Sequence, residues 1–230
     1  MILWLALFLL VIAISFVLAF QSMRDYQNIP QQSKAEYGLF LIRQTEKFDS
    51  KVLDSIREIL RGNANLIVSM ERLFRGSEAA LTIFGPKKIL DRFASEFSLL
   101  ELEDYTQNLE SQHISVWEVG VGDASQFKSD SIDNVFNNLP VLTAEEQFFW
   151  QIVVGGDQIQ IRAAVYSKDP VRRQTLVHQL QNLASGQLIK IPKPFSSEQM
   201  ITFYRLRSLS RDSKMPVLNS EGIIRLLKVI

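Results

Sequence analysis

The stretch EEQFFWQIVVGGDQIQIRAAVYS, residues 145–167, indicates most directly how this chain folds. Two runs rich in β-branched and aromatic residues flank a Gly-Gly-Asp turn at 155–157, which is typical of two antiparallel strands in a hairpin. Asp169 and Pro170 follow, and an aspartate before a proline is typical of the first turn of a helix. We therefore predict a β-hairpin and then a helix that continues to Ala184.

Further strands are predicted on both sides of this hairpin. HISVWEVGVG (residues 113–122) precedes it and QLIKIP (residues 187–192) follows the helix, and both have the apolar, β-branched character of strands. A short helix is predicted over Ser131–Asn138. The predicted order is therefore β-α-β-β-α-β, which is that of a ferredoxin-like unit.

The same order of elements is predicted in the preceding part of the chain. GLFLIR (residues 38–43) has strand character, and apolar residues between Phe48 and Leu60 recur at the spacing of one helix face. Two strands are predicted around a turn at residues 75–77, and a helix is predicted to begin at Pro86. A last strand is predicted over residues 99–105, so this half also follows the β-α-β-β-α-β order.

These patterns predict an α+β fold: an N-terminal transmembrane helix, two tandem ferredoxin-like units and a helical C-terminal tail. Ser196 or Ser197, and then Asn219 or Ser220, can cap the two helices of the tail. The expected segments are a membrane anchor (1–22), a linker (23–37), a first α+β unit (38–110), a second (111–192) and the tail (193–230).

The predicted anchor is an unbroken apolar run, ILWLALFLLVIAISFVLAF, from Ile2 to Phe20. A helix of this length covers the roughly 30 Å hydrocarbon core of a bilayer, so the bilayer is the first predicted partner. A cleaved signal peptide is the alternative, but no Lys or Arg precedes the run. Arg24 and Lys34 follow the run, so we expect a single-pass membrane protein whose soluble part is cytoplasmic.

Composition argues against several classes of function. The chain has 25 basic and 25 acidic residues, so it has no excess of positive charge and we expect no nucleic-acid partner. It has no cysteine, which excludes disulfides, thiolate nucleophiles and Cys-ligated zinc. The motif GxxxxGK[ST] is absent, which excludes a P-loop nucleotide hydrolase.

Few residues in the sequence suggest a catalytic or metal site. His113 and His178 are the only histidines and lie far apart in the sequence, so they predict no metal centre. Glu101 and Glu103 would share one face of a strand, where paired carboxylates suit acid-base catalysis or cation binding. A solvated strand face is the simpler interpretation of this pair. We therefore expect no enzymatic activity and no cofactor.

A mixture of aromatic and basic residues in the tail suggests a contact surface instead. Tyr204, Arg205 and Arg207 are assigned to partner binding, because tyrosine and arginine are enriched in binding hot spots. The expected function is that of a membrane-anchored scaffold or assembly module that binds protein partners. The alternative is a small enzyme or ligand-binding domain with a cleft between the two α+β units.

Four segments in the C-terminal half resemble the N-terminal, non-catalytic region of membrane-anchored conjugation-type ATPases, which are related to the motor ATPases of type IV secretion systems. These segments are EEQFFWQIVV (145–154), IRAAVYSKDPVRRQ (161–174), PFSSEQMITFYRLRS (194–208) and LNSEGIIRLLKV (218–229). The resemblance implies an anchoring and assembly module of a secretion or conjugation complex, a stand-alone relative of such a module, or a truncated piece of a longer ATPase. It carries over no catalytic residue, because the motor motifs are absent.

Overall fold

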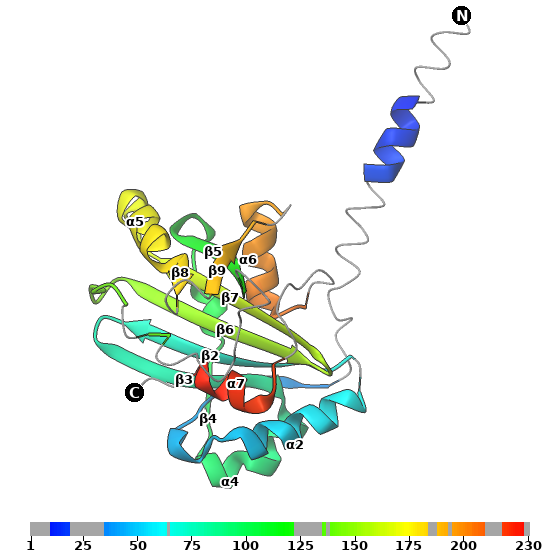
Figure 1. Cartoon of the computed structure of the whole chain (residues 1–230), viewed down its shortest axis with the longest axis vertical. Helices are drawn as coiled ribbons and strands as arrows, with labels where there is room; N and C mark the ends of the chain where they lie inside the picture. Colours follow the sequence, from blue (N-terminus) through cyan, green and yellow to red (C-terminus); the bar gives the residue numbers. More distant parts are fainter. Residues whose placement is uncertain are drawn as a thin grey trace, which may run out of the picture.

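Nine β-strands, each antiparallel to its neighbours, pair side by side in one sheet in the computed structural model (Figure 1). The structure describes residues 10–18, 35–63, 65–121, 135–136, 139–183, 188–192, 195–209 and 218–227. The strands are β1 (Tyr37–Leu41), β2 (Val68–Arg75), β3 (Glu78–Pro86), β4 (Leu100–Leu102), β5 (Ile114–Val121), β6 (Gln147–Gly155), β7 (Gln158–Tyr166), β8 (Asn182–Leu183) and β9 (Leu188–Ile191). The helices are α2 (Ser50–Arg61), α3 (Lys87–Leu90), α4 (Ala94–Phe97), α5 (Pro170–Leu180), α6 (Ser197–Leu206) and α7 (Ser220–Arg225). Short 3-10 turns are η1 (Thr45–Lys47), η2 (Asp91–Phe93), η3 (Tyr105–Asn108) and η4 (Ser111–His113).

The strand order across the sheet is β4-β1-β3-β2-β6-β7-β5-β9-β8. Strands of the predicted first unit form one side of the sheet, and strands of the predicted second unit form the other. If the two-residue strand β8 is left out and the other strands of each half are numbered along the chain, both halves have the order 4-1-3-2 counted toward the seam. β8 lies at the outer edge of the second half. The predicted α+β class with an antiparallel sheet is therefore confirmed.

The two halves meet where β2 pairs with β6. This pairing runs from Val68 opposite Val154 to Arg75 opposite Gln147, so it includes every residue of β2. Main-chain hydrogen bonds therefore join the two halves along this seam. The alternative interpretation of the sequence placed a ligand cleft between the two units, at the same position.

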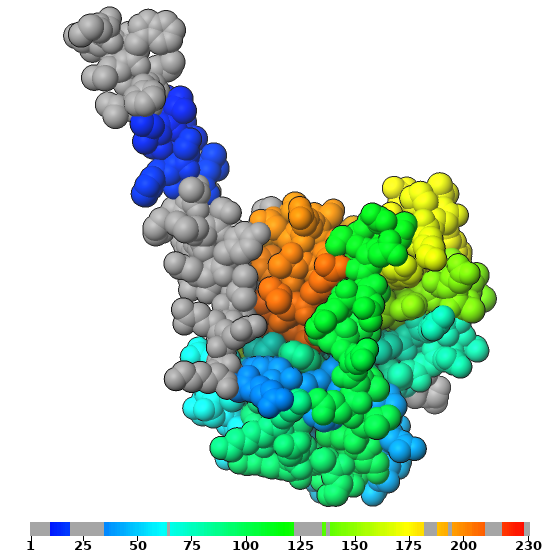
Figure 2. Space-filling view, turned by 180° about the vertical axis from the view of Figure 1, so that it is seen from behind, coloured from blue at the N-terminus to red at the C-terminus, as the bar shows by residue number. Residues whose placement is uncertain are grey.

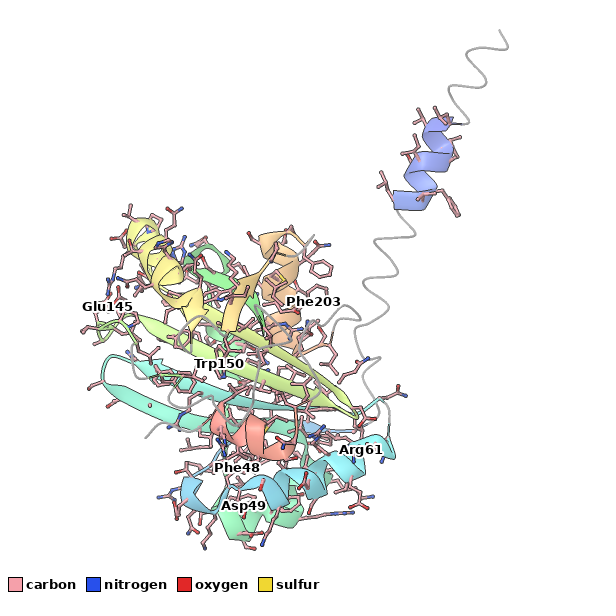
Figure 3. All side chains as sticks on the ribbon, in the orientation of Figure 1. Phe48, Asp49, Arg61, Glu145, Trp150 and Phe203 are labelled. Atoms are coloured by element: carbon pink, nitrogen blue, oxygen red, sulfur yellow. The ribbon has the colours of Figure 1, made fainter. Side chains whose placement is uncertain are left out.

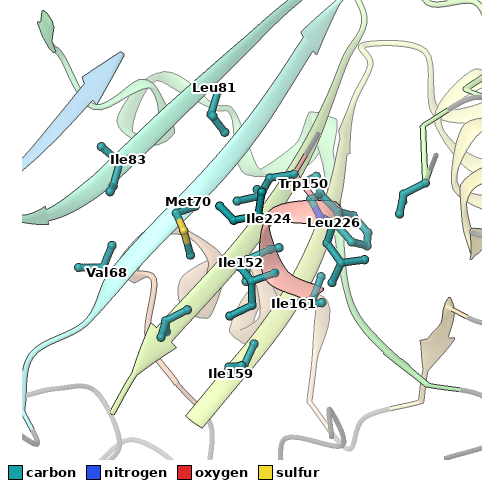
Figure 4. Close-up of a cluster of buried hydrophobic side chains, with 14 of the residues drawn as sticks. Val68, Met70, Leu81, Ile83, Trp150, Ile152, Ile159, Ile161, Ile224 and Leu226 are labelled. Atoms are coloured by element: carbon teal, nitrogen blue, oxygen red, sulfur yellow. The ribbon is translucent and has the colours of Figure 1, made fainter. Parts of the chain in front are cut away.

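Side chains alternate between two different faces of this sheet. On the apolar face, residues such as Met70, Trp150 and Ile161 form one large core with side chains from α2, α5 and α7 (Figure 4). The opposite face, which we call the polar face, carries a smaller apolar cluster that includes Ile201 and Tyr204 of α6. Helices of the C-terminal tail thus cover both faces of the sheet.

Local sequence signals explain where the longer helices begin. Asp49 precedes α2, and its carboxylate accepts hydrogen bonds from the N–H groups of Lys51 and Val52 (Figure 3). Asp169 caps α5 in the same way, and Pro170 is the first residue of that helix. The start of α5 was predicted from the sequence, whereas for α2 the sequence analysis predicted the helix and not its cap.

Two helices differ from their predicted lengths. α5 ends at Leu180 instead of Ala184, because Asn182 and Leu183 pair with β9 as the short strand β8. The helix predicted from Pro86 is divided into α3, η2 and α4, and Ser98 ends it in a left-handed conformation. The short helix predicted over Ser131–Asn138 lies outside the described residues except for a turn at residues 135–136.

The N-terminal anchor requires a correction. Of the predicted anchor, residues 10–18 are described, and they are helical. Within the described ranges, no helix is both long enough and apolar enough to cross a membrane. The predicted localisation as a single-pass membrane protein is therefore contradicted, and the transmembrane helix of the predicted fold class is unsupported.

Candidate functional site

A line of polar side chains crosses the polar face through the middle of five strands. Thr82, Glu71, Gln151, Arg162 and Glu118 are consecutive register partners on β3, β2, β6, β7 and β5. None of the five is more than 1% exposed. We call these five residues the polar row. Such a row needs internal partners, because a buried polar or charged group that lacks a hydrogen bond is destabilising.

The end of α6 supplies many of these partners. Nε of Arg207 donates to Oε1 of Glu71 at 2.8 Å, and Nη1 of Arg207 donates to Oδ2 of Asp104 at 2.7 Å. Nε2 of Gln151 donates to the main-chain oxygen of Tyr204 at 3.1 Å. Arg207 has a left-handed backbone conformation (φ 51°), which ends α6 and directs the chain onward. The polar row and the tail therefore form one hydrogen-bonded network.

Charge and burial shift the pKa values of several groups in this network. Burial, followed by the negative charge of Glu71, raises the pKa of Tyr105 and of Tyr204, whose hydroxyl oxygens are 2.6 Å apart. Burial alone would raise the pKa of Asp104, but hydrogen bonds and the charge of Arg207 lower it overall. The network therefore explains how α6 is held on the sheet.

The residues that we had assigned to partner binding belong to this buried network. Tyr204 and Arg207 are 0% exposed. Arg205 is half-buried, and its Nη2 donates to the main-chain oxygen of Leu109. A contact surface requires exposed side chains, so this is a correction: these residues attach α6 to the sheet.

The other residues singled out in the sequence lie apart from the network. Glu101 forms an ion pair with Lys87, with 2.7 Å between Oε1 and Nζ. Nε2 of His113 lies 3.5 Å from Oε2 of Glu110, and His178 lies on α5. These side chains do not come together with one another in the described part of the chain.

A different feature appears at β5, which is paired along only part of one edge. β7 pairs with β5 from Ile114 to Val119, whereas β9 pairs with it only from Glu118 to Val121. Pro192 follows β9, and a proline has no N–H to continue a ladder of hydrogen bonds. Residues 114–117 therefore have no strand beside them on the β9 side among the described elements.

The hydrogen-bonding groups on this open edge can be identified from the register. The main-chain oxygen of His113 accepts a hydrogen bond from the N–H of Ser167, on the β7 side. Main-chain groups of successive residues point to opposite sides of an antiparallel strand. The N–H and C=O of Ile114 and Val116 therefore face away from β7. No described residue pairs with these groups, so they form a template for another strand.

A groove of about 590 Å³ lies beside this open edge. Figure 2 shows the helix α6 in orange next to the green segment that contains β5, on the face of the molecule seen from behind. One wall of the groove includes Arg173, Val177 and His178 of α5, and the other includes Ser197 and Ile201 of α6. The edge is thus enclosed between two helices.

Trp117 also lines the groove, although its side chain is only 3% exposed.

In comparisons with known proteins, no family model and no curated protein matched this chain. The resemblance to conjugation-type ATPases therefore stays a prediction.

Sequence reasoning did not find this groove, although it predicted the strand itself. The extent of the open edge depends on where β9 stops, and Pro192 is the sequence signal for that stop. The two helical walls come from segments that are separated from β5 in the sequence. Their meeting depends on the strand order, which the predicted elements alone do not determine.

Proposed function

We propose that this chain is a non-enzymatic binding module that captures an extended segment of a protein partner along the open edge of β5. The observation that carries the proposal is the pair of outward-facing residues, Ile114 and Val116, whose main-chain groups have no partner among the described residues. In this mode of recognition, main-chain hydrogen bonds provide affinity and the walls of the groove select side chains.

The character of the edge supports this proposal. Proteins commonly protect exposed edges with short strands and charged residues. β4, at one outer edge of the sheet, has both devices: it has three residues, and Glu101 is ion-paired with Lys87. In contrast, the open part of β5 presents Ile114 and Val116 and contains no charged residue from 114 to 117.

The strand orders support the finer proposal that each half is a ferredoxin-like unit. In the second half, the strand equivalent to the fourth of such a unit is β9, which pairs with only four residues of β5. The groove then occupies the position that a longer fourth strand would fill. A bound segment would complete this half of the sheet.

The predicted resemblance to the non-catalytic region of conjugation-type ATPases is compatible with this role. That resemblance implies assembly with protein partners, and strand addition is a common way to join two proteins. Assembly within a secretion or conjugation complex is accordingly part of the proposal.

Amide hydrogen exchange tests the open edge in the unbound protein. In the full chain, we expect the amides of Ile114 and Val116 to exchange much faster than those of Ser115 and Trp117, which face β7. Equal protection of all four amides, measured by NMR, would show that the edge is already paired.

Strand addition itself is tested with decapeptides selected from a random displayed library for binding to the full chain. Val116→Pro removes an outward N–H without removing a β5–β7 hydrogen bond, whereas Val116→Ala keeps that N–H. We expect the proline variant to bind the selected peptides at least tenfold more weakly, and the alanine variant to remain within about threefold. Equal affinity of both variants, or no selected peptide that depends on this edge, would contradict the proposal.

A further inference from the structure

The two walls of the groove differ in chemistry, and this difference indicates what kind of segment fits between them. We infer that the segment added to β5 alternates acidic and apolar residues, with its carboxylates toward α5 and its apolar side chains toward α6. This inference rests on the proposed function, because it assigns the chemistry of the ligand at the same site.

The wall on the α5 side is basic. Arg173 and His178 lie on α5, and both line the groove. Lys190 on β9 is opposite Val119, and the side chain of Val119 belongs to the apolar-face core that includes α5 residues. Paired residues in a sheet point to the same face, so Lys190 lies on the α5 side as well.

The wall on the α6 side is apolar. Ile114 and Ile201 belong to the same buried cluster on the polar face, and Val116 packs against that cluster. All three residues line the groove. Ser197, at the start of α6, is the polar residue on this side.

The residues that line the groove include no Asp or Glu. Trp117 also lines the groove. Lys190 and His178 are exposed, so their side chains are accessible to a ligand. Donors and positive charges without a lining carboxylate favour a ligand that brings carboxylates.

The geometry of a β-strand implies that a segment bound between these two walls has an alternating sequence. Successive side chains of a β-strand point to opposite faces, so a segment paired with Ile114 and Val116 sends alternate residues to the two walls. One set meets Arg173, His178 and Lys190, and the other set meets the apolar wall. Residues 114–117 extend over roughly 13 Å, so a six-residue peptide is long enough to pair along the whole edge.

This chemistry also distinguishes among other possible occupants. A basic segment would place like charges against Arg173 and Lys190. A second copy of this chain, paired edge to edge, would bring its own basic wall next to the first. An acidic, alternating partner segment avoids both repulsions.

Three fluorescein-labelled, acetylated peptides test the pattern by fluorescence anisotropy with the full chain. They are (Glu-Val)₃, (Lys-Val)₃ and the block sequence Glu₃Val₃, which has the same composition as the first. We expect (Glu-Val)₃ to bind at least tenfold more tightly than either of the others. Its affinity should fall as salt is added, because the charged wall is partly exposed to solvent.

A charge-reversed variant tests which wall selects the acidic residues. We expect Arg173→Glu/Lys190→Glu to bind (Glu-Val)₃ at least tenfold more weakly and to prefer (Lys-Val)₃. The control Lys51→Glu/Lys88→Glu has the same change in net charge at exposed residues outside the groove lining, and it should stay within about twofold of wild type. A gain of affinity for (Lys-Val)₃ cannot result from misfolding, so unchanged preference in the groove variant would overturn the inference.

The proposed function and the inference fail in different ways. If wild type binds (Lys-Val)₃ or Glu₃Val₃ as tightly as (Glu-Val)₃, and Val116→Pro weakens all of these complexes, the acidic pattern is wrong but strand addition stands. If (Glu-Val)₃ binds wild type and Val116→Pro equally, strand addition is wrong, and the inference falls with it. If sedimentation shows a dimer that Val116→Pro dissociates, a second copy occupies the edge, and the acidic partner is rejected.

Discussion

The two faces of the sheet are attached to their helices by different kinds of interaction. On the apolar face, Met70 and Ile152 are register partners and pack within one large hydrophobic core. One residue further along β2, Glu71 lies on the polar face and binds Arg207 through two charged hydrogen bonds. The same pair of strands therefore supports α7 through apolar packing and the end of α6 through charge.

The apolar face therefore contributes mainly to stability, whereas the polar face determines the position of its helix. Apolar burial is non-directional and stabilises many slightly different arrangements of a helix. A buried ion pair contributes little net stability, but removal of one partner leaves an uncompensated charge. The polar row thus fixes where α6 must sit, because only one position brings Arg207 to both Glu71 and Asp104.

The largest expected effect comes from breaking the polar face at Arg207. We expect Arg207→Met to lower the free energy of unfolding by about 4 kcal/mol, because Glu71 then remains buried without its ion-pair partner. Urea unfolding of the full chain measures this loss. The double variant Glu71→Leu/Arg207→Met should recover most of it, since both buried charges are removed. A single-variant loss below about 1 kcal/mol would show that the pair is unimportant.

The matching change on the apolar face is Met70→Ala. This side chain is 0% exposed, and its truncation should lower the free energy of unfolding by about 3 kcal/mol through lost burial and a residual cavity. Met70→Leu is the control and should cost less than about 1.5 kcal/mol. If alanine and leucine had the same effect, the apolar face would depend on something other than packed volume.

Alkaline pH should weaken the polar face and leave the apolar face unaffected. Burial and the charge of Glu71 raise the pKa of Tyr105 and Tyr204 above the ordinary value of 10.0. A raised folded-state pKa contributes stability that is complete below pH 10 and is lost as the pH rises further. Each tyrosine should therefore lower the free energy of unfolding by about 1.4 kcal/mol per pH unit above pH 10. Urea titrations between pH 9 and 11 measure this slope, and Tyr105→Phe should make it shallower.

Removing a helix cap should have the smallest effect on the free energy of unfolding, and the loss should be similar for a helix on either face of the sheet. Ser196 forms a capping box with Gln199 at the start of α6, and Asp49 caps α2. Ser196→Ala and Asp49→Ala should each lower the free energy of unfolding by about 1 kcal/mol. Ser197→Ala, beside the first cap, should stay within about 0.5 kcal/mol of wild type in the same urea assay. A much larger effect at Ser196 would mean that the start of α6 also depends on the polar network.

Local patterns were sufficient to predict most strands, the helix α2 and the start of α5. A strand was predicted before the turn at residues 75–77, and it contains Glu71, but a carboxylate in a strand is normally assigned to solvent. Its burial depends on Arg207, which is 136 residues away, and no local pattern reports such a contact. Tyr204, Arg205 and Arg207 were assigned to partner binding because they are aromatic or basic, and the same properties let them bind the sheet. The assignment was wrong because the contact between Arg207 and Glu71 is not visible in the sequence.

The distance along the chain between Glu71 and Arg207 also has a consequence for biosynthesis. At 5–20 residues per second, a ribosome needs roughly 7 to 27 seconds to add the 136 residues between them. During that interval β2 and β3 have been made, but the guanidinium that neutralises Glu71 has not. The nascent first half therefore keeps Glu71 hydrated until α6 and Arg207 have been made. A chain interrupted before α6 keeps this face of the sheet open to water.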